Sequence, residues 1–195
     1  MITGYIVSAL KYAIVFCVIY IIVKKIYLRH NGKKFVLKSE ILYIIFGAYI
    51  VALLSQTIIP ICNIFFVDGK FLIEVSTYNA RGLNIIPFKT ILNYLTGAND
   101  FYGDANMTIR IVNLLGNICL FVPFGFLFPM VFDKFSKVQI TLSFGILLSV
   151  FIEIMQFFIE RSSDIDDTIL NCIGVFLGYM CYKILSALSI KHKIK

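Results

Sequence analysis

The stretch that decides the fold is residues 109–132, IRIVNLLGNICLFVPFGFLFPMVF, which carries a single charged side chain. At 1.5 Å per residue, a helix of this length is about 36 Å long, enough to cross a hydrocarbon core about 30 Å thick. The stretch nevertheless holds Asn113 and Asn117 near one end, and Pro123 and Pro129 near the other. We therefore expect a membrane-spanning helix, bent by its prolines, with polar groups on one face.

The whole chain has the composition of a membrane protein. Of its 195 residues, 59% are hydrophobic and 15% charged, and the mean hydropathy is +0.89. Soluble domains are typically about half apolar and a quarter charged. The sequence therefore predicts an all-α polytopic membrane helix bundle, as a single domain over residues 1–195. Its five expected transmembrane segments are Gly4–Val23, Ile41–Pro60, Ile109–Phe132, Val138–Ile159 and Thr168–Leu188.

The distribution of basic residues predicts how the chain crosses the membrane. Lys and Arg number six in the first connection, two in the third and four at the end of the last segment. The second and fourth connections hold four and one. By the positive-inside rule, the N-terminus lies outside and the C-terminus in the cytoplasm. The net charge of +7 follows from this topology, so we expect a lipid bilayer as partner and no nucleic acid.

The second connection, Ile61–Thr108, is an extracytoplasmic loop of about 50 residues in this topology. Two apolar runs flank Asp68-Gly69, a dipeptide typical of a β-hairpin turn. Further on, Pro87 is suited to start a short helix that extends to Leu95. We expect this helix to lie flat at the membrane surface or to fold back over the bundle.

Polar residues in the last three segments gather at one depth. With the predicted orientation, Asn113, Asn117, Glu153, Gln156 and Asn171 all fall in the outer leaflet. The i,i+4 spacing of the first two and the i,i+3 spacing of the next two place each set on one helix face. A polar side chain in hydrocarbon is costly and marks a bundle interior or a site. The pattern predicts one shared outer-leaflet pocket.

Five charged residues precede the last segment, Glu160, Arg161, Asp164, Asp166 and Asp167, and the last four of them are candidate site residues. A structural alternative applies to the acids, because Asp164 or Asp166 is well placed to cap the following helix. Glu153 has a similar alternative as an internal clamp between helices, and the amides as interhelical hydrogen-bond partners. These alternatives stay open beside ligand binding.

Two glycines in the last segment, Gly174 and Gly178, have the spacing that permits close helix contact. This spacing favours packing within the chain, with dimerisation as the alternative.

The polar residues also form an ordered set of short motifs within residues 78–179. In chain order they are Arg81-x-x-Asn84-x-x-Pro87-Phe88, Asn113-x-x-Gly116-Asn117, Phe121-x-Pro123-x-Gly125-x-x-x-Pro129, Glu153-x-x-Gln156 and Arg161-x-x-Asp164-x-Asp166-Asp167-x-x-x-Asn171-x-x-Gly174-x-x-x-Gly178. This set resembles the VanZ-like family of bacterial integral membrane proteins, whose namesake is associated with teicoplanin resistance. The resemblance implies a cell-envelope protein linked to glycopeptide or lipoglycopeptide tolerance.

The leading interpretation is a binding protein without cofactor or metal, whose outer-leaflet pocket engages an amphiphilic molecule, a lipid-linked cell-wall precursor or a lipoglycopeptide. Guanidinium suits phosphate or carboxylate, and amides suit sugar or amide groups. The candidate ligand-binding residues are Arg81, Asn84, Asn113, Asn117, Glu153, Gln156, Arg161, Asp164, Asp166, Asp167 and Asn171.

Three other interpretations remain. In a membrane-embedded hydrolase or transferase acting on a lipid-linked precursor, Glu153 is the candidate catalytic base, and Asp166 and Asp167 would hold a divalent cation. The sequence offers no phosphate-binding loop and no clear nucleophile for such an enzyme. The others are a small transporter and a structural partner in a larger complex.

Overall fold

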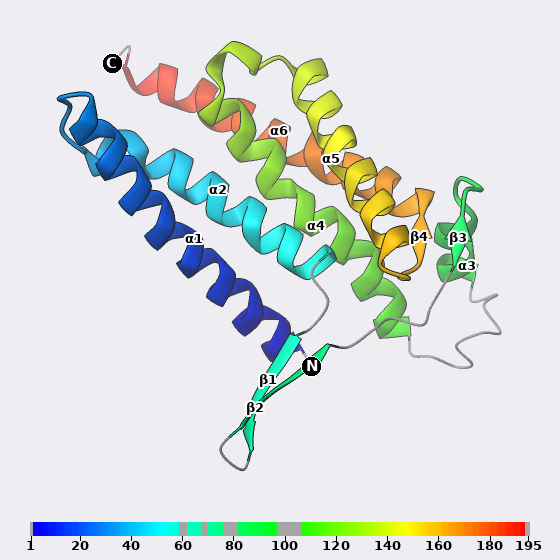
Figure 1. The fold of residues 1–195 in the computed structure, drawn as a ribbon. Coiled ribbons are helices and arrows are strands. Elements are labelled where there is room, and N and C mark those ends of the chain that lie inside the picture. Colours follow the sequence, from blue (N-terminus) through cyan, green and yellow to red (C-terminus); the bar gives the residue numbers. More distant parts are fainter. Residues whose placement is uncertain (1, 59–61, 68–69, 76–81, 97–106, 194–195) are drawn as a thin grey trace. The chain divides into compact units, whose positions relative to one another are not determined.

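The computed structural model describes residues 2–58, 62–67, 70–75, 82–96 and 107–193. The chain divides into two compact units, Met1–Ser76 and Thr77–Lys195, whose helices and strands are labelled in Figure 1. Five of the described helices are long and apolar enough to cross a membrane, over Val7–His30, Leu37–Thr57, Ile111–Val131, Val138–Phe158 and Ile165–Leu188. The predicted all-α polytopic membrane bundle is confirmed.

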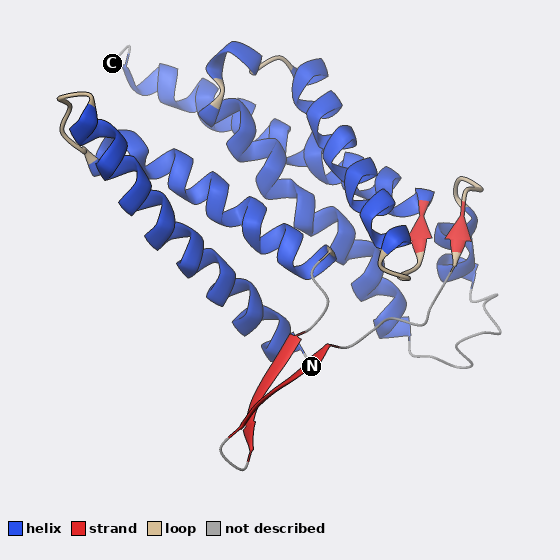
Figure 2. Cartoon of the chain, in the orientation of Figure 1, coloured by secondary structure: helices blue, strands red, loops and turns tan. Residues whose placement is uncertain are grey.

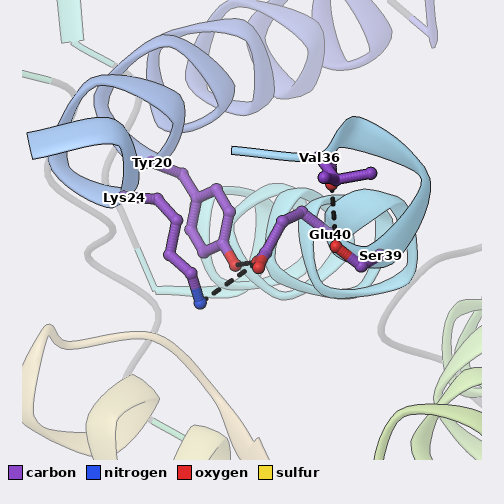
Figure 3. Close-up of polar contacts among 5 residues, drawn as sticks. All are labelled: Tyr20, Lys24, Val36, Ser39 and Glu40. Carbon is purple, nitrogen blue, oxygen red and sulfur yellow. Dashed lines mark hydrogen bonds and ion pairs between the residues drawn. The ribbon is translucent and has the colours of Figure 1, made fainter. Parts of the chain in front are cut away.

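The first unit is built on a pair of helices, α1 (Ile2–His30) and α2 (Leu37–Thr57). The Tyr20 hydroxyl of α1 donates a hydrogen bond of 2.6 Å to Oε2 of Glu40, at the start of α2 (Figure 3). The Lys24 ammonium lies 3.2 Å from the same oxygen. A buried carboxylate is thus paired by two groups from the neighbouring helix, which fixes how these helices pair.

A β-hairpin follows in the same unit, formed by β1 (Cys62–Val67) and β2 (Lys70–Val75) (Figure 2). The strands are antiparallel, and their register pairs Val67 with Lys70 and Cys62 with Val75. The hairpin predicted around Asp68-Gly69 is therefore confirmed.

The second unit contains α4 (Met107–Val131), the short 3-10 helix η2 (Asp133–Phe135), α5 (Val138–Phe158) and α6 (Ile165–Lys193). It also holds a short helix, α3 (Lys89–Thr96), from the predicted outer loop. Both internal prolines lie within α4, which is assigned as one helix over its full length.

Helices α4 and α6 pack with their backbones in close approach. A Cβ added at Gly174 or Gly178 would collide with the backbone of α4, and one added at Gly125 would collide with the Val175 carbonyl of α6. Only glycine fits such contacts, as is common between membrane helices. The glycine pair of α6 therefore serves packing within the chain, which confirms the favoured interpretation. Phe121, Ile152 and Val175 fill the core between the three long helices.

Candidate functional site

The segment 82–96, called the outer loop after its predicted side of the membrane, is joined to the connection between α5 and α6 by a short parallel strand pair. Strand β3 (Leu83–Asn84) pairs with β4 (Ser163–Asp164), and the Ser163 N–H donates a 2.9 Å hydrogen bond to the Gly82 carbonyl. Main-chain pairing thus places two distant segments over the end of α5, where Glu153 lies.

Asp166 lies in the first turn of α6 and is completely buried. Its Oδ1 accepts the Phe88 N–H at 2.5 Å, and its Oδ2 accepts those of Thr90 at 2.7 Å and Ile91 at 3.1 Å. These N–H groups lie at the start of α3, so Asp166 caps a helix other than its own. The predicted start of this helix at Pro87 is two residues early, because the capped end begins at Lys89.

Asp164 caps α6 itself and also binds the outer loop. Its Oδ1 accepts the Asp166 N–H at 2.9 Å, which satisfies a free donor in the first turn of α6. The same oxygen accepts a hydrogen bond of 2.9 Å from the Asn84 amide, while Oδ2 accepts one of 2.5 Å from the Thr90 hydroxyl. The predicted cap is therefore Asp164. It also explains why α6 begins at Ile165, three residues before the predicted segment.

Glu153 is buried in the C-terminal part of α5, with 8% of its surface exposed. Its Oε2 accepts the Asp164 N–H at 2.7 Å, and the Ser163 side chain also hydrogen-bonds to this carboxyl. Arg161 lies within electrostatic range of Glu153. Gln156 is buried one turn further along α5. Its main-chain carbonyl accepts a hydrogen bond of 3.0 Å from the main-chain N–H of Arg161. These contacts hold the end of α5 against β4.

Two further side-chain contacts join the long helices to one another. The Asn117 amide on α4 hydrogen-bonds to Oδ1 of Asp167 on α6. The buried Asn171 amide donates a 2.8 Å hydrogen bond to the Ser149 hydroxyl on α5, which in turn lies 3.3 Å from the Thr168 hydroxyl. The structure thus shows Asn117 and Asn171 in the interhelical role considered from the sequence.

The structure brings most, but not all, of the candidate residues together. Asn113 is exposed on α4, and Arg81 lies outside the described residues. Sequence reasoning missed Thr90, which bridges Asn84 and Asp164, and it missed Ser149. The spacing carried a signal for Ser149, since it lies four residues before Glu153 on the same face of α5.

A cavity of about 320 Å³ lies where the outer loop, the end of α5 and the start of α6 meet. Asn84, Glu153, Ser163 and Thr168 supply its polar groups, and apolar side chains form the rest of its wall. A mostly apolar hollow with a few convergent polar groups is the usual form of a small-molecule site. Its apolar wall consists of Leu83, Ile85, Val150, Ile154, Phe157, Phe158 and Ile165.

Asp166 and Asp167 do not converge on a common point. Asp166 accepts backbone N–H groups of the outer loop, while Asp167 binds Asn117 on α4. Within the described part of the chain, no three His, Cys, Asp or Glu side chains are grouped to hold a metal ion. The two aspartates that the enzymatic interpretation offered for a divalent cation therefore bind different partners.

The fold and the site define a multi-pass membrane protein with a polar cluster and a cavity at one end of a three-helix packing unit. The family model described as VanZ/LLP1 matches residues 40–186, and the chain belongs to this family. Protein VanZ of Enterococcus faecium is 30% identical over 122 residues, or 62% of this chain. The match spans 62% of the length of that curated relative. No solved structure matches the chain.

Proposed function

We propose that this protein lowers susceptibility to glycopeptide and lipoglycopeptide antibiotics of the teicoplanin type by binding an amphiphilic or lipid-linked molecule in the cavity beside Glu153. Its membership of the VanZ/LLP1 family supports the link to antibiotics. The observation that carries the binding role is the cavity itself, because it combines apolar walls with the polar groups of Asn84 and Glu153.

The proposed orientation puts this cavity at the outer face of the membrane. Lys33, Lys34 and Lys38 are exposed in and beside the connection between α1 and α2, and Lys134 and Lys137 are exposed between α4 and α5. Such basic connections favour the cytoplasmic side. The N-terminus then lies outside, the C-terminus inside, and the α5–α6 connection faces the cell wall.

Different polar residues have different roles in this proposal. Asn84 and Glu153 line the cavity, so they contact the ligand head group directly. Asp164 and Asp166 hold the outer loop against α6 through their hydrogen bonds. Arg161, within electrostatic range of Glu153, attracts an anionic part of the ligand.

The test is the inhibitory concentration of teicoplanin in cells that lack the gene and are complemented with variants. Wild type should restore tolerance, whereas Glu153→Gln and Arg161→Ala should leave the cells as susceptible as the deletion. Glu160→Gln is the control, because this neighbouring glutamate is absent from the cavity wall. Membrane levels are compared by immunoblot. Full tolerance with Glu153→Gln at normal membrane level would contradict the proposal.

A further inference from the structure

A second cavity, of about 600 Å³, lies along the seam between α5 and α6. Leu142 and Ile146 line it from α5, and Cys172, Ile173 and Phe176 line it from α6. Thr168 lines both this cavity and the one beside Glu153. The two cavities therefore adjoin each other at the first turn of α6.

Helix geometry shows that the two cavities follow one path. The α5 residues of the second cavity, Leu142 and Ile146, are followed at the same four-residue spacing by Val150 and Ile154, which line the first. Residues four apart lie above one another on a helix face. One stripe of α5 thus forms the same wall of both cavities.

Polarity changes along this path from one end to the other. Asn84 and Glu153 lie at the outer end, whereas the wall from Ile146 to Phe176 is apolar. The Thr168 hydroxyl lies 3.3 Å from the Ser149 hydroxyl, so it has a partner within the bundle and requires none from a ligand. The path matches a molecule with a polar head and an apolar tail.

The path has the length and the openness that a hydrocarbon tail requires. From Ile165 to Phe176 the helix rises about 16 Å, roughly half of the hydrocarbon core. Ile146, Ile173 and Phe176 are 39%, 43% and 45% exposed, so the seam opens sideways. A lipid-linked molecule can therefore enter it from the bilayer without passing through water.

We infer that the α5–α6 seam binds the hydrocarbon chain of a single-chain amphiphile, with a donor-bearing head group at Asn84 and Glu153. The inference rests on the proposed function and names the ligand class of the same site. A head with hydroxyl, amide or ammonium donors fits, because carboxyl oxygens accept hydrogen bonds. A single chain fits, because α5 contributes only one stripe of side chains, Leu142 and Ile146, to the seam.

The experiment uses the full chain in phosphatidylcholine nanodiscs and a dodecyl glucoside with a photoreactive diazirine. With the diazirine at the chain end, labelling should concentrate on Ile146, Ile173 and Phe176. With the diazirine beside the head, labelling should move to Ile154 and Phe157. Labelling in proportion to exposure over all lipid-facing residues, or none in the seam because bulk lipid or a second copy of the chain covers it, would overturn the inference.

A matched pair of variants sharpens the result. Ile146→Trp fills the seam and should weaken seam labelling roughly tenfold, which corresponds to about 1.4 kcal/mol of lost binding. Leu147→Trp is the control, since Leu147 is 64% exposed on the same helix and absent from the cavity wall. Equal labelling of both variants, or displacement of the probe by a two-chain glycolipid as efficiently as by an alkyl glucoside, would also overturn it.

The outcome is separable from that of the proposed function. Oriented seam labelling with normal teicoplanin tolerance in Glu153→Gln cells would leave the seam as a lipid site and refute the antibiotic role. Loss of tolerance in Glu153→Gln cells with unoriented labelling would support the antibiotic role and refute the binding of a hydrocarbon chain in the seam.

Discussion

Glu40 and Glu153 each expose 8% of their surface, yet their surroundings differ. Glu40, in the first unit, accepts a hydrogen bond from Tyr20 and pairs with Lys24, both from the adjacent helix. Glu153, in the second unit, binds the backbone of Asp164 and also lines a cavity. A buried carboxylate is therefore not a site in itself; an adjoining cavity distinguishes the two.

The two units also differ in how far apart in sequence their polar partners lie. Tyr20 and Glu40 are 20 residues apart, whereas Asn84 and Asp164 are 80 apart. The first pair closes a helical hairpin, and the second closes a long outer loop over helix ends. Substitutions that remove the contacts of the long loop should therefore destabilise more of the structure than loss of the Tyr20–Glu40 contact.

The largest effect is expected for Asp166→Ala. The change leaves three backbone donors of the outer loop without their acceptor, which costs about 3 kcal/mol at roughly 1 kcal/mol each. We expect a lower melting temperature in detergent and faster proteolysis within residues 82–96. Asp133→Ala, at an exposed aspartate, should match wild type. Equal stability of the two variants would show that the long-range cap is dispensable.

A somewhat smaller loss of folding stability is expected for Gly178→Ala. The added Cβ meets the Val122 carbonyl of α4, and overpacking of this kind costs about 2 kcal/mol. Gly116→Ala is the control, because a Cβ there meets nothing within 4 Å. Thermal unfolding of both variants measures the difference. An unchanged melting temperature for Gly178→Ala would refute close packing between α4 and α6.

In the first unit, Tyr20→Phe removes the hydrogen bond to Glu40 and should cost about 1 kcal/mol. Lys24 still pairs with the carboxylate, which limits the loss. Hydrogen exchange should increase in α1 and α2 and stay unchanged in α4 to α6. Tyr27→Phe, at a tyrosine 61% exposed, serves as the control. Increased exchange in α6 would contradict a local role for the Tyr20 contact.

The smallest effect is expected for Asn117→Leu, which removes the contact with Asp167. Hydrogen bonds between membrane helices contribute about 0.6 kcal/mol on average. Asn113→Leu, one turn earlier on α4 at an exposed position, should cost less still. Denaturant unfolding of the two variants measures whether the Asn117 amide contributes more to stability than the Asn113 amide. A larger loss for Asn113→Leu would contradict a stabilising role for the Asn117–Asp167 contact.

Local pattern was enough to predict the helices, the hairpin at Asp68-Gly69 and a cap of the last helix by Asp164 or Asp166, because each depends on neighbours in sequence. The first segment was predicted to end at Val23, but α1 continues to His30. The predicted segment stopped before the charged side chain of Lys24. In the structure, Lys24 forms an ion pair with Glu40 on α2.

The cap at Asp166 was beyond sequence reasoning. Its partners lie 75 to 78 residues away, and no periodicity links an aspartate to the N–H groups of a distant helix. Thr90 was missed for the same reason, since its hydroxyl gains a role only when the loop meets α6.

The measurement that tests the distinction between the two glutamates most directly is teicoplanin susceptibility of deletion cells complemented with Glu40→Gln or Glu153→Gln. Both changes neutralise the carboxylate of a residue with 8% of its surface exposed, and both proteins are compared at matched membrane levels. We expect Glu40→Gln to restore tolerance and Glu153→Gln to fail. Restoration by both, or loss in both, would contradict a ligand site confined to the second unit.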